Sequence, residues 1–357
     1  MKLLTAVVLI NCFIHIQSHS IGKRKNFLSD SLRESVSSDN THYKNEDEIC
    51  RLFPFPVTSP SWDSPFTAWE KNKNGNIKRL KIVNEIYVPS TIFYLQYLEE
   101  LVIQNTTFEE SLHQAPKINK RLAPLLTKLT IRNVPITHLP EVIGELRFLR
   151  SLKVTNTDLE TLPDFIGKLS SLTKLSLQDN KLSSIPSTIK KLDSLDTLDL
   201  RNNKQLRSIH NLNGHSNLKV LHADNCSIEF IPNHLPKLKD LQMGENQLTD
   251  IFGIETLGSE TNEKKNFFFS NNLIRYLTPF IRRVNNLVEL NLNGNLLYSL
   301  PKDIYDITTM KDLYIKNNYM KDEDLKEIVM MFMEKNITKV YYEDQKYNLH
   351  GPRTFLC

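Results

Sequence analysis

Cysteine is scarce in this sequence, with four residues in 357. Cys12 lies in the apolar run near the start of the chain, while Cys50 and Cys357 are separated by most of the sequence. A disulfide requires Cα atoms within about 7 Å of each other, so we expect no bond between Cys50 and Cys357. Cys226 interrupts a regular pattern described below, and we expect it to be a buried thiol.

Sequence motifs of catalytic and metal sites are also missing. There is no Gly-x-x-x-x-Gly-Lys phosphate loop, no Gly-x-Ser-x-Gly, no His-Glu-x-x-His and no Cys-x-x-Cys. His210, His215 and His222 are close in sequence, but their spacing matches no common metal site, and we expect exposed histidines in loops and strands. The sequence therefore predicts neither an enzyme nor a cofactor, and no metal site.

Two further classes are disfavoured by charge and hydropathy. Lys and Arg number 45 against 41 Asp and Glu, an excess far below that of a dedicated nucleic-acid-binding domain. After residue 20 no stretch approaches the roughly 18 consecutive apolar residues of a membrane-spanning helix. We therefore expect neither a nucleic-acid partner nor a membrane span.

The first 49 residues resemble a targeting segment followed by a flexible one. Residues 1–20 combine a basic start, an apolar run over 3–16 and small residues at Ser18 and Ser20, which predicts a signal peptide cleaved before Ile21 and a secreted protein. An uncleaved signal anchor is the alternative. Residues 21–49 are polar and are expected to be a disordered arm. We interpret the basic triplet at 23–25 as solvated, with a processing or nuclear-targeting site as the alternative.

What the chain does contain is a repeat with a period of 23 residues. The fullest copy, residues 172–192, has the order Leu-x-x-Leu-x-Leu-x-x-Asn-x-Leu-x-x-Ile-Pro-x-x-Ile-x-x-Leu. Counting two degenerate early copies, the second leucine of eleven repeats falls at Leu80, Leu101, Leu129, Leu152, Leu175, Leu198, Leu221, Leu241, Phe267, Leu290 and Leu313. A fixed period of 20–29 residues is typical of a leucine-rich-repeat solenoid.

Each part of the repeat has a physical role. The Leu-x-Leu alternation predicts a strand with its leucines on one face, and proline suits the start of the helical segment that follows. The asparagine can bond backbone groups that no ladder satisfies, forming a structural Asn ladder. It occupies Asn180, Asn203, Asn246, Asn272, Asn295 and Asn318. Val134, Thr157 and Cys226 replace it elsewhere, and valine cannot make these bonds.

This pattern resembles leucine-rich-repeat proteins of the Ras-associated scaffold and plant intracellular Ras-group type. The resemblance implies an α/β repeat fold, a horseshoe with a concave parallel β-sheet and convex short helical or 3-10 segments. The chain lacks the cysteine-knotted caps of many secreted animal relatives. A signal peptide before an intracellular-type repeat would suit export into a host cell's cytoplasm, or an ordinary wall or extracellular protein.

The remaining segments are expected to close the ends of the array or to loop out of it. Residues 50–76 contain both tryptophans and are predicted to be an aromatic N-terminal cap, with an aromatic binding platform as the alternative. The repeats then span 77–320, and 321–357 form a C-terminal cap of a helix and an edge strand. Polar insertions are expected at 111–124 and 258–265.

Function is predicted to lie on the concave face, where side chains between the leucines point. The charges are segregated by repeat, as expected for a surface that docks a polar protein partner in one orientation, although charges needed only for solubility could segregate by chance. The basic residues are Arg79, Lys81, Lys128, Arg132, Lys153 and Lys174; the acidic ones are Asp199, Asp224, Asp240, Glu289 and Asp312; Phe268 and Tyr314 are predicted exposed anchors. Glu100, Arg201 and Lys316 are exceptions to the segregation.

Two points stay open at this stage. Glycosylation sequons stand at Asn105, Asn225 and Asn336, and glycans on the first two would obstruct the concave face. The predicted function is a secreted protein-binding scaffold. The alternative is a regulatory subunit or inhibitor of a phosphatase or small GTPase, and the oligomeric state is not predicted.

Overall fold

The computed structural model describes residues 46–51, 53–55, 61–108, 122–334, 339–343 and 345. The predicted signal peptide, almost all of the predicted polar arm, most of the 111–124 insertion and the Asn336 sequon lie outside these residues. The chain divides into two units, Met1–Glu48 and Ile49–Cys357, and only the first residues of α2 (Glu46–Arg51) are described in the first unit. In the described part of the chain, every helix is too short or too polar to cross a bilayer.

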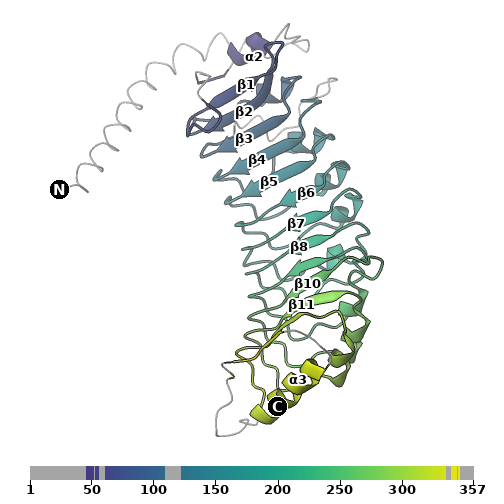
Figure 1. The fold of residues 1–357 in the computed structure, drawn as a ribbon. Coiled ribbons are helices and arrows are strands. Elements are labelled where there is room, and N and C mark those ends of the chain that lie inside the picture. The colour runs from purple at the N-terminus through teal and green to yellow at the C-terminus, as the bar shows by residue number, and fades with distance from the viewer. Residues whose placement is uncertain are drawn as a thin grey trace, which may run out of the picture. The chain divides into compact units, whose positions relative to one another are not determined.

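One sheet runs through the second unit, and its strands follow one another in chain order (Figure 1). The thirteen strands among the described residues are β1 (Ala68–Lys71), β2 (Ile77–Val83), β3 (Glu100–Gln104), β4 (Lys128–Arg132), β5 (Ser151–Thr155), β6 (Lys174–Ser176), β7 (Thr197–Asp199), β8 (Val220–His222), β9 (Asp240–Gln242), β10 (Lys265–Phe268), β11 (Leu287–Asn291), β12 (Asp312–Tyr314) and β13 (Lys339–Tyr341). β1 pairs antiparallel with β2, and every later pair is parallel. This is a leucine-rich-repeat solenoid, as the sequence predicted.

The repeat register is confirmed strand by strand from β2 to β12. Leu175 of β6 pairs with Leu152 of β5 and with Leu198 of β7, and the same position pairs throughout the array. In the 26-residue repeat, Phe267 takes this position and pairs with Leu241 and Leu290. These side chains are buried, because each repeat covers the leucines of its neighbour.

Short 3-10 helices lie on the other side of the stack (Figure 1). They are η1 (Ser90–Tyr94), η3 (Glu141–Glu145), η4 (Asp164–Lys168), η5 (Ser187–Lys191), η6 (His210–Leu212), η7 (Ile254–Thr256), η8 (Pro279–Arg283) and η9 (Lys302–Asp306). Proline directly precedes five of them, as expected from its fixed φ. Pro232 is different: no helix forms in the described segment 223–239, which belongs to the short 20-residue repeat.

The six ladder asparagines are buried and bond to the backbone of two repeats at once. Asn203 donates from Nδ2 to Leu177 O at 2.9 Å and to Leu200 O at 2.7 Å, and its Oδ1 accepts from Leu182 N at 3.0 Å. Its amide therefore satisfies groups that the short strands leave open. Cys226 makes a weaker contact, with Sγ 3.4 Å from Leu200 O, and burial raises the pKa of its thiol to about 11.

The two ends of the array are covered by different elements. At the N-terminal end β1 pairs along the edge of β2, and the buried rings of Phe53 and Phe55 stack with centroids 5.6 Å apart. At the C-terminal end β13 pairs with β12, and α3 (Asp322–Glu334) buries Leu325, Ile328 and Phe332. The edges of the sheet are therefore the short strands β1 and β13, and short edge strands limit pairing with other chains.

Candidate functional site

The candidate site is the exposed face of the sheet, defined by three positions in each repeat. They are the residue before the second leucine, the residue after it, and the residue two further on. In β4 these are Lys128, Thr130 and Arg132, which alternate with buried Leu129 and Ile131. We call this surface the sheet face; it corresponds to the concave face predicted from the sequence.

The basic part of the sheet face spans three neighbouring strands. Lys128, Arg132, Lys153 and Lys174 lie on β4, β5 and β6, all at least partly exposed. None of the four side chains has a hydrogen-bond or ion-pair partner among the described residues. They therefore create a positive surface that the rest of this region does not neutralise.

Arg79 and Lys81 do not belong to this open positive surface, contrary to the sequence prediction. The Arg79 guanidinium bonds Glu70 and Glu100 at 2.9 Å each, and its Cζ lies 3.9 Å from the centre of the Trp62 ring. Lys81 donates to the backbone carbonyls of Trp62 and Ser64. Residues of the N-terminal cap thus cover the first repeat and bind the charged groups of Arg79 and Lys81. The pattern of β2 alone could not reveal these contacts.

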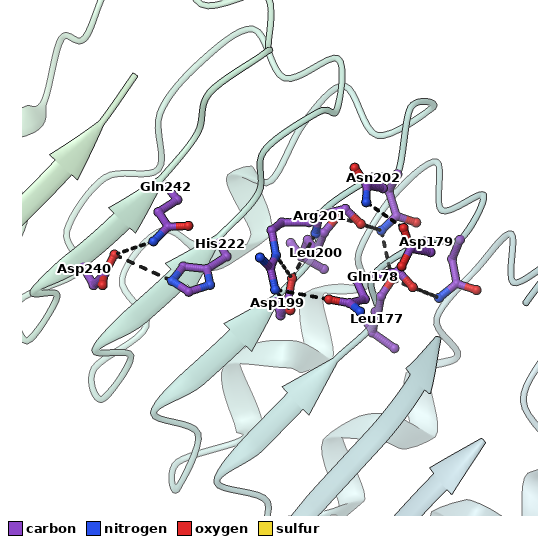
Figure 2. A network of polar contacts seen from close by, with 12 residues as sticks. Leu177, Gln178, Asp179, Asp199, Leu200, Arg201, Asn202, His222, Asp240 and Gln242 are labelled. Carbon is purple, nitrogen blue, oxygen red and sulfur yellow. Dashed lines mark hydrogen bonds and ion pairs between the residues drawn. The ribbon is translucent and has the colours of Figure 1, made fainter. Parts of the chain in front are cut away.

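A polar network joins the middle strands (Figure 2). Asp199, predicted as a partner-binding acid, is almost buried and binds Arg201 through two bonds of 2.8 and 2.9 Å. The same Arg201 reaches Gln178 at 3.1 Å. Asp199 and Arg201 therefore neutralise each other, and Asp199 is not an open acid.

His222 and Asp224 also belong to the middle of the face. His222 Nε2 lies 3.6 Å from Asp240 Oδ1, and Figure 2 shows the two side chains facing each other. Asp224 Oδ1 accepts from Gly244 N at 2.8 Å, and burial raises the pKa of its carboxyl. Of the three histidines expected to be exposed, His215 is instead buried, which lowers its pKa.

Open acids gather on β9, β11 and β12. Asp240 and Glu289 both pair with Asn266, and Glu289 pairs with Asp312, so the three carboxylates follow one row across the sheet. Burial together with Asp312 and Asp240 raises the pKa of Glu289. Among the described residues no lysine or arginine forms an ion pair with any of these three carboxylates, although Asp240 faces His222 and Lys339 of β13 follows Asp312 in the same row.

The two predicted aromatic anchors are half-buried, not exposed as expected. Tyr314 stacks on Tyr341 of β13, with ring centroids 4.4 Å apart and planes 2° from parallel. Burial and the carboxylates of Glu289 and Asp312 raise the pKa of Tyr314 to about 12. The final strand, β13, thus adds the ring of Tyr341 to the acidic end of the sheet face. The sequence analysis had assigned this strand only to the C-terminal cap.

A second row of amides, absent from the sequence prediction, lies beside the buried ladder. Asn133 Nδ2 donates to Asn105 Oδ1 at 2.9 Å, and Asn156 Nδ2 donates to Asn133 Oδ1 at 2.6 Å. Asn225 bonds Asn202 in the same way at 2.8 Å. All five have φ between 51° and 61°, a region that asparagine tolerates better than most residues.

This outer amide row bears on the two described sequons. Asn105 and Asn225 each donate a proton from Nδ2, the atom to which a glycan would be attached. Both residues are at least partly exposed, so the row itself does not hide them. The signal in the sequence was an amide or acid directly before the ladder position, as in Asn202 and Asn271.

Lys265 departs from its predicted place in a polar loop. Lys265 begins β10 and pairs with Leu287 of β11, the first leucine of the next repeat, and its exposure is 0 %. Its Nζ donates to Thr261 O at 3.1 Å, and to Asn285 O and Oδ1 at 2.8 and 2.6 Å. Burial lowers its pKa. Its side chain therefore pins the inserted loop to the stack.

Comparison with known families agrees with this architecture. The model of the family described as leucine-rich repeat region matches residues 121–332, more than half of the chain. The chain belongs to the leucine-rich-repeat family. Within the matched region lie β4 to β12, and therefore both the basic and the acidic parts of the sheet face.

Individual relatives are distant. A probable inactive serine/threonine-protein kinase, roco10 of Dictyostelium discoideum, is 30% identical over 128 residues, which are 35% of this chain and 4% of that protein. The chain therefore spans only a small part of this curated relative.

Solved structures are similar in fold. An internalin (InlF) of Listeria monocytogenes aligns with a TM-score of 0.55 and 19% identity, over 77% of this chain and 87% of that one. A chain of the Toll–Spatzle complex from Drosophila aligns with a TM-score of 0.61 and 18% identity, over 76% and 36%. At such identities the likeness is one of fold.

Proposed function

We propose that this protein is a non-enzymatic scaffold that binds a protein partner on its sheet face. The observation that carries the proposal is the separation of open charge: cations on β4–β6 and carboxylates on β9–β12. Complementary charges would orient a partner along the array, with its acidic part on β4–β6 and its basic part on β9–β12. The similar structure of the Toll–Spatzle complex contains a bound protein, and this supports the proposal that the ligand of this chain is a protein.

The acidic end supplies the strongest contacts in this proposal. Tyr314 and Tyr341 form a flat, half-exposed aromatic surface next to Asp312 and Glu289. Aromatic rings next to carboxylates suit the long alkyl and cationic parts of Lys and Arg side chains. Aromatic residues also dominate the energetics of protein interfaces, so Tyr314 is the proposed anchor.

The test is affinity capture with the full-length chain, followed by binding measurements on the recovered partner. We expect the double reversal Lys128→Glu/Lys153→Glu to slow association and to reduce its salt dependence, and Tyr314→Ala to cost more than about 1 kcal/mol. The matched control is Lys190→Glu/Lys191→Glu, which makes the same charge change on exposed residues of η5. Equal effects of the two reversals, or none from either, would refute binding on the sheet face.

Compartment and regulatory role belong to the same proposal. We propose that residues 1–20 direct secretion, and N-terminal sequencing of the exported protein should then begin at Ile21. Retention of residues 1–20 would instead support an uncleaved anchor.

Recovery of a phosphatase or a small GTPase in the capture would favour a regulatory subunit or inhibitor, and export into a host cell would be needed for such a partner.

A further inference from the structure

A second surface lies outside the sheet face, on the turns that lead from the strands toward the 3-10 helices. In the last four repeats these turns carry apolar side chains. We call this surface the aromatic edge; it consists of Phe252, Leu273, Tyr276, Leu296, Tyr298 and Tyr319. Phe252 and Tyr276 are 64% and 68% exposed, and Tyr298 is 47% exposed.

Backbone hydrogen bonds place these turns next to one another. Arg275 N donates to Thr249 O at 3.3 Å, Leu296 N to Ile274 O at 2.9 Å, and Tyr319 N to Leu297 O at 2.9 Å. The rings of Tyr298 and Tyr319, from successive repeats, lie 5.7 Å apart. The apolar residues therefore follow consecutive turns of the solenoid and form one stripe.

The fold itself does not require apolar residues at these positions. In the fourth and fifth repeats the corresponding turns carry Asp158, Glu160, Lys181 and Ser183, and Lys181 Nζ forms an ion pair with Asp158 at 2.7 Å. Those polar turns stack through the same kind of backbone bond, from Ser183 N to Glu160 O at 3.2 Å. The fold therefore allows polar or apolar residues at these turns; outside the last four repeats the exposed apolar ones include Ile86 and Phe230.

Its size is that of an interface. An aromatic side chain buries about 150–250 Å² when covered, so the exposed parts of this stripe together offer roughly 500 Å² of apolar surface. The largest apolar patches on monomers are about 300–600 Å² and are often functional. With a polar rim, two such edges facing each other would approach the roughly 1,200 Å² of a specific interface.

We propose that the aromatic edge joins two copies of this chain in a two-fold dimer. A two-fold contact requires a surface that is complementary to itself. The edge meets this condition, because it has an acid at one end and a base at the other. Asp250 lies in the eighth repeat and Lys321 in the eleventh, with Arg275 between them. Lys321 is exposed and has no ion-pair partner among the described residues. In the antiparallel arrangement Asp250 of each copy faces Lys321 of the other, and Arg275 faces Tyr298.

Such a dimer leaves the sheet face of each copy open. The aromatic edge contains none of the residues proposed to bind the partner, so dimerisation does not depend on the proposed function. Two open faces on one particle would strengthen binding to a multivalent partner through avidity.

Analytical ultracentrifugation of the full-length chain from roughly 1 to 100 µM tests this proposal, because weak dimers dissociate in that range. We expect a monomer–dimer equilibrium whose dissociation constant rises at least about tenfold in Tyr276→Ser/Tyr298→Ser. Ile86→Ser is the matched control, since Ile86 is 59% exposed on the corresponding turn of the first repeat. A wild-type monomer at every concentration, or a dimer that both variants weaken equally or neither weakens, overturns the proposal.

Two further measurements locate the contact without relying on the serine variants. Asp250→Lys and Lys321→Asp should each weaken the dimer, and the two together should restore it. Hydroxyl-radical footprinting of the wild-type chain should show Tyr276 and Tyr298 protected at high concentration, while Tyr314 on the sheet face stays reactive. Protection of Tyr314 but not of Tyr276 would place the dimer contact elsewhere and refute the aromatic edge.

Discussion

The first four repeats and the last four carry asparagines at different positions of the same turn. In the first four, the outer row of Asn84, Asn105, Asn133 and Asn156 forms an unbroken chain of side-chain hydrogen bonds. The buried ladder position there contains no asparagine. In the last four, the buried asparagines are all present, and the outer position holds Glu245, Asn271, Gly294 and Asn317, which form no side-chain bonds between repeats within the described part of the chain.

The middle repeats carry both systems. Asn180 and Asn203 occupy the buried ladder, while Asp179, Asn202 and Asn225 bond one another in the outer row. A change from one system to the other therefore occurs without a break in the leucine register. The two systems do different work: the buried asparagines bond backbone groups of the turn, whereas the outer amides bond one another and link the side chains of successive repeats.

The surface charge of the sheet face also changes along the array. The basic strands β4–β6 and the acidic strands β9–β12 share a register and a buried core, but they carry opposite open charges and different turn residues. The core therefore determines the fold, while the exposed positions are free to determine what is bound. Substitutions in each region should separate these two roles.

The largest effect is expected in β7, where the two regions meet. Leu198 is fully buried between Leu175 and Leu221, so Leu198→Ala should lower the free energy of unfolding by about 2–5 kcal/mol. Because each repeat packs only on its neighbours, the loss should reach both regions in hydrogen-exchange measurements. Thr197→Ala, a neighbouring residue on the half-exposed face, is the control. A loss below about half a kilocalorie in urea denaturation would contradict the packing described here.

The next effect compares the two amide systems directly. Asn295→Ala should cost about 2–3 kcal/mol, because it leaves Phe269 O, Leu292 O and Ile274 N without partners in a buried turn. Asn133→Ala should cost about 1 kcal/mol, since its exposed amide bonds can be replaced by water. In Asn133→Gly the strain of a φ of 54° is also removed, so its loss should be smaller still. Equal losses at Asn295 and Asn133 in thermal denaturation would remove the distinction between the systems.

The sequence revealed the periodic part of this molecule and little of what breaks the period. The leucine register could be predicted from β2 to β12, because burial on one face enforces strict spacing at Leu80 as at Leu313. The outer amide row escaped notice because exposed asparagines are common in this chain, and only the φ values of residues such as Asn133 explain them. Lys265 occupies the position of the first leucine of its repeat because the register shifts between Lys265 and Asn266 of β10, and the spacing of the sequence does not reveal this shift.

Open charge on the sheet face could be predicted in part. Lys128 and Lys174 lie where the alternation placed them, since strand periodicity fixes which side chains point outward. Arg79 forms ion pairs with Glu70 and Glu100, and Asp199 forms one with Arg201, while Lys81 donates to two backbone carbonyls of the N-terminal cap. Such pairing depends on contacts between segments distant in sequence or on side-chain conformation, neither of which the repeat pattern encodes.

The smallest effect should come from the acidic row, and it should depend on pH. Burial, and after it the carboxylates of Asp312 and Asp240, raise the folded-state pKa of Glu289 above its unfolded value. The folded state therefore binds this proton more tightly than the unfolded state does. Its contribution to stability is complete below the unfolded pKa and is lost as the pH rises through the folded pKa.

Glu289→Gln should accordingly stabilise the protein slightly at neutral pH, by less than about 1 kcal/mol for a half-exposed group. The difference from the wild type should shrink as the pH falls toward 4, near the ordinary pKa of a glutamate. Lys174→Gln on the basic strands is the matched control, because it replaces a charged side chain by the same amide outside the acidic row, and its effect should not follow that of Glu289→Gln. The measurement is thermal denaturation of all three proteins between about pH 4 and 8. If the Glu289→Gln difference grows on acidification, the acidic row is not under the mutual repulsion inferred from its geometry.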